Sequence, residues 1–254
     1  MFLHTHPYEP FLFEEATRLI VGTLPPPRFT TGELRTGDVD FCYGSRDGQL
    51  WPILDRIFGL GLTYETTDRA VQQRIDFLLE HKIGICDIVK SAERSKIDAS
   101  DLGLSHIELR HMFGYLRQYP KIDTLLFTGG NSKNGPEYFF RKYLKGFGLK
   151  LKLISNEIPR IHEFVLPSPM GEQGSSENGI RVIRTVSLTA PSGAANRAVG
   201  SMEAYKRMKI KNPELTTVDF RAMQYKAYFS SLPAKCLGRE KEQKAGAYPS
   251  EGPG

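Results

Sequence analysis

Residues 18–27, Arg-Leu-Ile-Val-Gly-Thr-Leu-Pro-Pro-Pro, give the clearest indication of the fold. The apolar run that ends at Val21 is typical of a buried strand, and the prolines after Gly22 exclude a helix, so a loop must begin there. Further apolar runs predict four more buried strands, at residues 83–89, 124–127, 149–154 and 181–188.

Helical patterns lie between these strands, at residues 49–58, 68–81, 105–118, 137–144 and 202–209. Strands that alternate with helices indicate an α/β fold with a mainly parallel central sheet. We expect a single domain over residues 1–235. Residues 236–254 are polar and rich in Gly and Pro, which predicts a disordered tail.

Composition argues against secretion and membrane insertion. The 254 residues are 40% hydrophobic and 25% charged, and no run approaches the roughly 18 apolar residues that a membrane span needs. The cysteines Cys42, Cys86 and Cys236 lie far apart and show no metal-ligand spacing. We therefore expect a reduced, cytoplasmic chain without a structural metal or an iron–sulfur cluster.

The net charge of +5 is mild, but its distribution is uneven. Residues 141–152 carry five basic and no acidic residues, and residues 197–211 carry five basic and one acidic residue. These stretches could follow a phosphate backbone or could be ordinary solvated helix faces. Charge alone does not separate the two interpretations.

Ligands of parallel α/β sheets bind where loops leave the carboxyl ends of the strands. The corresponding loops here are residues 23–49, 90–98, 128–135 and 189–197. They contain no GxGxxG or GxxxxGK[ST] phosphate loop and no GxSxG nucleophile elbow. These absences argue against nucleotide-dependent phosphoryl transfer and against a serine hydrolase of the usual α/β type.

Two aspartates are candidates for chemistry. Asp47 lies among small residues just before an apolar helix, where it could cap that helix or serve as a catalytic carboxylate. Asp87 lies within an apolar strand pattern and needs a partner there, which favours a bracing role. His4 and His6 could chelate a metal, but a mobile N-terminus is the favoured interpretation.

Five blocks carry a resemblance to a known family. They are Leu19–Pro25 (LIVGTLP), Phe41–Leu54 (which begins FCYG and ends WPIL), Gly84–Arg94 with Asp98, Thr124–Gly129 (TLLFTG) and Leu188–Asn196 (LTAPSGAAN). In this order they resemble the uracil-DNA glycosylase superfamily, and most closely its hypoxanthine-DNA glycosylase-like branch. The resemblance implies a three-layer α/β/α fold.

The chain departs from the pattern of that branch at two positions. Gly48 stands where the branch places an asparagine that its members use in catalysis, and Asp47 precedes it. Thr128 stands where many members carry an asparagine at the end of the base-reading strand. A hydroxyl cannot present an amide's paired donor and acceptor, so we expect a base other than uracil, or a bulkier one, to fit equally well.

The resemblance implies a monofunctional DNA glycosylase that leaves an abasic site, with Asp47 as the catalytic residue. A base pocket is expected from Gly22, Thr23, Leu24, Pro25, Phe41, Tyr43, Ser45, Thr128 and Asn131. DNA contacts are expected from Pro191, Ser192, Gly193, Ala194, Ala195, Asn196 and Arg197. Asp87 and Ser91 would support the site. We expect no metal or cofactor, a monomer, and DNA with a damaged or modified base as the partner.

Two other functions remain open at this point. A catalytically inactive DNA-binding protein with the glycosylase fold would account for the changes at Gly48 and Thr128. An α/β enzyme that acts on small molecules would show no salt-dependent affinity for DNA. Residues 157–179 are expected to form an insertion of unassigned role.

Overall fold

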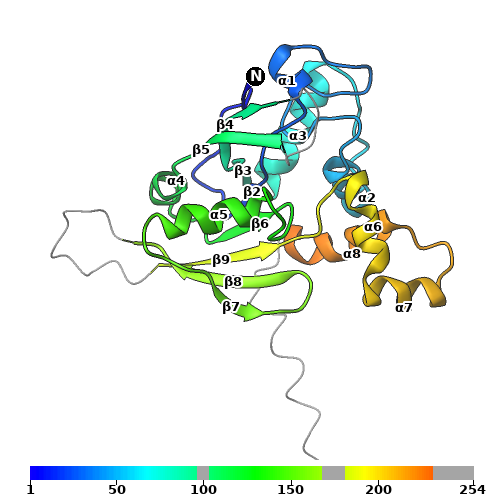
Figure 1. Cartoon of the computed structure of the whole chain (residues 1–254). Coiled ribbons are helices and arrows are strands. Elements are labelled where there is room, and N and C mark those ends of the chain that lie inside the picture. Colours follow the sequence, from blue (N-terminus) through cyan, green and yellow to red (C-terminus); the bar gives the residue numbers. More distant parts are fainter. Residues whose placement is uncertain (96–102, 168–180, 231–254) are drawn as a thin grey trace, which may run out of the picture.

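A six-stranded sheet forms the centre of the computed structural model, which describes residues 1–95, 103–167 and 181–230 (Figure 1). Its strand order is β3-β2-β6-β9-β8-β7. Four neighbouring strands are parallel: β3 (Ile83–Ile85), β2 (Arg18–Val21), β6 (Thr124–Phe127) and β9 (Val182–Ser187). The other two pair antiparallel: β8 (Arg160–Val165) with β9, and β7 (Lys152–Ser155) with β8.

Helices cover both faces of this sheet. Ile20 and Leu126 point to the face covered by α2 (Leu50–Phe58), α3 (Asp68–Glu80) and α8 (Thr217–Phe229). Their neighbours Leu19 and Leu125 pack on the other face, against α4 (Met112–Gln118) and α5 (Pro136–Lys145). This alternation is what a strand buried on both faces requires. The expected three-layer α/β/α fold with a mainly parallel sheet is therefore confirmed.

The helix expected at residues 105–118 is wrong in its first half. Residues 104–109 form β5 (Leu104–Leu109), and only α4 is helical. β5 pairs antiparallel with β4 (Val89–Arg94), which also pairs with β1 (Phe2–Thr5). Hydrogen bonding to β4 thus overrides the local helical pattern. The N-terminus expected to be mobile is an ordered strand of this second sheet, and His4 is fully buried.

The strand expected at residues 83–89 divides at Asp87. β3 ends at Ile85, and the chain crosses to the second sheet, where β4 starts at Val89. Ile88 N–H donates to the Gly22 carbonyl at 3.0 Å, which holds the crossing against the loop that follows β2. Asp87 therefore lies at a break between two sheets rather than within a buried strand.

The remaining elements among the described residues are four helices and a 3₁₀ turn. Pro27 occupies the first turn of α1 (Pro27–Thr31), a position that proline tolerates. A 3₁₀ turn at Gly193–Ala195 leads into α6 (Asn196–Ser201) and α7 (Glu203–Lys211). Of these, α7 confirms the helix expected at residues 202–209. α8 was not expected, although Thr216 and Asp219 form a capping box at its start.

Part of the expected insertion belongs to the sheet, because β8 pairs along the whole of β9. Residues 168–179 of it, the tail at residues 236–254, Cys236 and Asp98 lie outside the described residues. No helix in the described part of the chain is long and apolar enough to cross a membrane.

Candidate functional site

A cavity of about 790 Å³ opens at the carboxyl ends of the four parallel strands. The segments after β2, β3, β6 and β9 all contribute to it, as Thr23–Pro26, Asp87, Thr128–Gly129 and Ala190–Ala194. The segment Tyr43–Leu50, which leads into α2, and Ser132–Pro136, which leads into α5, complete its wall. The cavity therefore occupies the position where ligands of such sheets bind.

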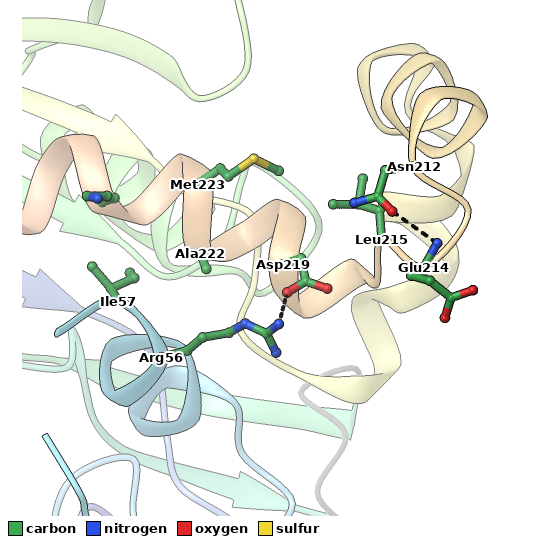
Figure 2. Close-up of a pocket in the computed structure, with 9 residues that line it drawn as sticks. Arg56, Ile57, Asn212, Glu214, Leu215, Asp219, Ala222 and Met223 are labelled. Carbon is green, nitrogen blue, oxygen red and sulfur yellow. Dashed lines mark hydrogen bonds and ion pairs between the residues drawn. The ribbon is translucent and has the colours of Figure 1, made fainter. Parts of the chain in front are cut away.

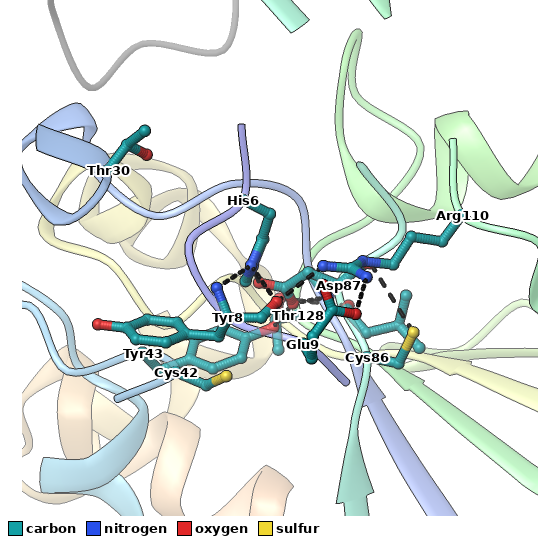
Figure 3. Close-up of polar contacts among 12 residues, drawn as sticks. His6, Tyr8, Glu9, Thr30, Cys42, Tyr43, Cys86, Asp87, Arg110 and Thr128 are labelled. Atoms are coloured by element: carbon teal, nitrogen blue, oxygen red, sulfur yellow. Dashed lines mark hydrogen bonds and ion pairs between the residues drawn. The ribbon is translucent and has the colours of Figure 1, made fainter. Parts of the chain in front are cut away.

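A buried polar cluster forms the floor of this cavity (Figure 3). Oδ1 of Asp87 accepts hydrogen bonds from the Tyr43 hydroxyl at 2.8 Å and from Gly22 N–H at 2.7 Å. Its Oδ2 lies 3.0 Å from Nε2 of His6. The Thr128 hydroxyl lies 3.2 Å from the Tyr43 oxygen. Asp87 thus has three partners from three separate segments, in line with the bracing role expected for it.

Tyr43 reaches this floor through an unusual backbone conformation. Its φ is 59°, in the left-handed region, which costs on the order of 1–3 kcal/mol for a residue other than glycine. A Cβ on Gly22 would lie 2.2 Å from the Tyr43 hydroxyl oxygen, so only glycine fits against the hydroxyl end of this side chain. Burial, and then the charge of Asp87, raise the pKa of Tyr43 well above its ordinary value. The phenol therefore stays protonated and donates to Asp87.

Asp47 lies at the wall of the cavity, and its side chain is 69% exposed. Oδ2 lies 3.4 Å from a guanidinium nitrogen of Arg28, and its N–H donates to Ser45 Oγ at 3.2 Å. The N-cap of α2 is Gln49, and no side-chain bond caps this helix. The capping alternative for Asp47 is therefore wrong, and its carboxylate faces solvent and one guanidinium.

Arg28 is fixed by a second, buried carboxylate. Nε and Nη2 of Arg28 donate to the two oxygens of Asp38 at 2.7 and 2.8 Å, and Nη2 also donates to Ser45 Oγ at 2.8 Å. Asp38 further accepts the N–H groups of Arg35 and Arg46. Burial alone would raise the pKa of Asp38, but these donors bring it down to about 2. The segment that carries Asp47 is thus bound through Ser45 to the Arg28–Asp38 ion pair, in which both groups stay charged.

The loop after β9 is held from two sides. Gln49 N–H donates to the Pro191 carbonyl at 2.9 Å, and Gly48 and Ser192 form an isolated antiparallel bridge. From α8, Gln224 accepts the Thr189 N–H at 2.8 Å. This loop and the Asp47 segment are therefore neighbouring walls of one cavity.

The structure brings together most of the residues expected at the site. Those that line the cavity are Thr23, Leu24, Pro25, Tyr43, Ser45, Asp47, Asp87, Thr128 and Pro191–Ala194. Gly22 lies behind its floor. Those that do not line it are Phe41, Ser91, Asn131, Ala195, Asn196 and Arg197.

Three of these residues do not act as expected. Phe41 is only 9% exposed and packs against Trp51 and Phe11, so its ring is not available to stack on a base. Its place in an aromatic core was not visible from sequence. Ser91 lies on β4 and donates to Glu108, on the second sheet. Asn196 turns away from the cavity, where its side chain accepts from Thr217 and Arg221.

Several residues at or behind the cavity wall were not named individually as site candidates. Lys133, Asn134 and Gln49 line it, and Arg28 and His6 support it from behind. For Lys133, Asn134 and Gln49 the sequence did offer a signal, because all three lie at or just before the start of a predicted helix. His6 and Arg28 reach the site only through the tertiary fold, because their partners lie 81 and 10 residues away.

The two basic stretches differ in their relation to the cavity. Arg197 and the cations of α7 follow directly after the loop that lines it, on an arm that projects from the body (Figure 1). No residue of α7 is buried. By contrast, α5 begins at the cavity and runs away from it, so Lys142 and Lys145 lie in its far turn. The basic residues of 197–211 therefore follow the cavity loop along the chain, whereas those of 141–152 lie toward and beyond the far end of α5.

A second hollow of about 450 Å³ lies between α2, α8 and the turn after α7 (Figure 2). Arg56 and Asp219 form an ion pair across it at 2.5 Å, and Met223 and Leu215 supply apolar surface. Within the described ranges, no three His, Cys, Asp or Glu side chains gather in a way that could hold a metal ion.

Comparison with known proteins gives a fold relationship. No protein-family model and no curated protein sequence matches this chain. Its structure is similar to the solution NMR structure of a "putative Uracil DNA glycosylase" from Methanosarcina acetivorans, with 18% sequence identity and a TM-score of 0.50. The match covers 90% of this chain and 97% of the other. The two proteins therefore share an α/β fold over nearly their whole length.

Proposed function

We propose that this protein is a monofunctional DNA glycosylase, which hydrolyses the N-glycosidic bond of a base that has left the DNA stack. One observation carries the proposal: a cavity at the carboxyl edge of this fold combines a polar floor with an exposed carboxylate, Asp47, at its wall. The shared fold adds support, and the basic arm that follows the cavity loop in the chain suits a polyanionic partner.

The cavity suits a base turned out of the duplex, because the glycosidic carbon is out of reach inside the stack. Tyr43 gives its only proton to Asp87, so its oxygen can accept a hydrogen bond from the base. The Thr128 hydroxyl beside it can donate or accept. Backbone groups of Thr23–Pro26 would contact the other edge of the base.

Hydrolysis requires a water oxygen to bond to C1′ of the sugar while the electrons of the C1′–N bond leave with the base. The transition state carries positive charge on the sugar, which a nearby carboxylate stabilises. Asp47 would orient the water and accept its proton, and the departing base would take up a proton from solvent. Arg28 would hold the carboxylate in place.

DNA would lie across the mouth of the cavity. The loop Pro191–Ala194 would press on the backbone and minor groove, and Arg197 with the cations of α7 would neutralise phosphates. This arrangement predicts affinity that falls as salt rises.

Uracil, hypoxanthine and a bulky modified cytosine of phage DNA are the candidate substrates. Gly48 and Thr128 support a pocket that is wider than one for uracil alone, because neither supplies an amide side chain. Deaminated bases would place the enzyme in base-excision repair, and modified cytosines would place it in defence against phage.

The test is alkali-induced cleavage of labelled DNAs that carry uracil, hypoxanthine, xanthine, or hydroxymethylated and glucosylated cytosine. We expect cleavage of one substrate class by the full chain and loss of cleavage in Asp47→Asn. Tight, salt-sensitive DNA binding without any cleavage would instead support the inactive DNA-binding protein. Full activity in Asp47→Asn would exclude the role given to Asp47.

A further inference from the structure

Arg221, on α8, connects the two walls of the cavity from beneath. Its side chain is fully buried. Nη1 donates to Gln49 Oε1 at 3.0 Å and to Asn196 Oδ1 at 2.9 Å, and Nη2 donates to the Ser192 carbonyl at 3.2 Å. One guanidinium thus holds the segment before α2 and the loop after β9, which are more than 140 residues apart in the chain.

These acceptors carry no formal charge. Burial lowers the pKa of Arg221, and Nε has no hydrogen-bond partner among the described residues. A buried cation with neutral partners stabilises a fold less than an apolar side chain of similar size would. Packing alone therefore does not account for an arginine here, whereas the planar guanidinium is well suited to joining several acceptors at fixed geometry.

The same face of α8 supplies two more contacts to the loop. Gln224 and Tyr225 follow Arg221 by three and four residues, which places all three on one side of the helix. Gln224 accepts the Thr189 N–H at 2.8 Å, and the Tyr225 hydroxyl donates to the Thr189 carbonyl at 2.7 Å. The loop after β9 is therefore fixed at Thr189, Ser192 and Asn196 by a single helix.

We infer that Arg221 is a positioning residue, which sets the distance between the Asp47 wall and the Pro191–Ala194 loop before any ligand arrives. The inference rests on the proposed function. Gln49 directly follows Gly48 and Asp47, so a shift of its side chain moves the carboxylate segment as well. Arg221 touches the walls and does not line the cavity itself.

A matched control exists at the other end of the sheet. Arg18 is half-buried rather than fully buried, but burial likewise lowers its pKa. Its guanidinium likewise donates to uncharged oxygens, the carbonyls of Tyr228, Ser230 and His81. Arg18 begins β2, whose opposite end faces the cavity. Arg18→Met therefore removes a comparable set of bonds without touching either wall.

The experiment uses the full chain as Arg221→Met, Arg221→Lys and Arg18→Met. Amide hydrogen exchange of peptides covering residues 45–50 and 189–197 is measured at a temperature where each variant is folded. The single-turnover excision rate is measured at saturating substrate DNA. In Arg221→Met we expect faster exchange in both peptides and a rate lowered by about 10²-fold, because small misplacements of reacting groups cost this much.

The variants separate positioning from stability. Arg221→Lys should recover part of the rate, since an ammonium can reach some of the acceptors. Arg18→Met should lower the melting temperature and leave exchange in these two peptides and the rate unchanged. Wild-type exchange in both peptides of Arg221→Met, or equal loss of rate in Arg18→Met, would overturn the inference.

Failure of the proposed function has a different signature. If the wild type cleaves no DNA, the proposed function fails, and the exchange data alone show whether Arg221 holds the two walls. If Arg221→Met does not fold, Asn196→Ala replaces it, because this change removes one acceptor from the loop. Unchanged exchange of residues 189–197 in a folded Asn196→Ala would then contradict the inference.

Discussion

Arginine side chains have different roles at the two edges of the parallel sheet. At the amino edge, Arg18 and Arg181 donate to carbonyls near the ends of α3, α8 and α4, and these contacts close the helix termini. At the carboxyl edge, Arg28 and Arg221 hold loops that surround a cavity, beside the strained Tyr43 and the exposed Asp47. Arginines at the amino edge thus fix the ends of helices, and arginines at the carboxyl edge fix the loops around a cavity.

Asp47→Ala should have the largest effect on the carboxyl edge. We expect excision to fall by roughly 10²–10⁴-fold, because the variant loses the group that orients water. The melting temperature should hardly change, because the side chain is 69% exposed. Alkali cleavage of substrate DNA together with a thermal melt measures both. Asp76→Asn, on the exposed side of α3, is the matched control and should keep full activity.

Gly22→Ala should come next. The new Cβ would meet the Tyr43 hydroxyl at 2.2 Å and Asp87 Oδ1 at 2.7 Å, so the polar floor must move. We expect a loss of about 1–3 kcal/mol in stability and a strong loss of excision. Gly200→Ala is the control, because a Cβ there meets nothing within 4 Å. Equal effects of the two changes in urea melts would show that the floor is not tightly packed.

The lowered pKa of Asp38 leads us to expect that the free energy of unfolding falls in acid. Its pKa is about 2 in the folded protein, against 3.8 ordinarily, so its contribution is fully present above pH 4 and is lost as the pH falls through 2. That contribution is roughly 2 kcal/mol, and Asp38→Asn should remove it at pH 7. Urea melts of both proteins between pH 7 and pH 2 should converge at the acid end. A constant difference across this range would contradict the prediction.

The basic arm should give the smallest effect. Arg207→Gln with Lys211→Gln should weaken DNA binding a few-fold and lower the salt dependence by about two in slope, because each removed phosphate contact contributes about one. Lys142→Gln with Lys145→Gln, in the far turn of α5, is the control and should change neither quantity. Fluorescence titrations at several salt concentrations measure both. Equal slopes for the two double variants would remove the arm from the DNA contact.

Sequence predicted the parts of this molecule that depend on local pattern. β2, β6, β9, α2, α3 and α5 follow from apolar periodicity. Asp47 was singled out by its place just before α2, and the Pro191–Ala194 loop by its place after the strand that became β9. β5 was missed because pairing with β4 overrides its helical pattern. Phe41 and Arg221 were misassigned or missed because burial in an aromatic cluster and bonding to a distant loop leave no local signal.

The position of Asp87 has a consequence for how the chain folds. Its carboxylate gathers donors from His6, Gly22 and Tyr43, which lie 81, 65 and 44 residues away. Closing loops of this length slows folding, so contacts of this kind form late. The floor of the cavity is thus expected to be completed only when the first strand docks. Until β1 docks, His6 is missing from the floor and Asp87 lacks one of its three partners.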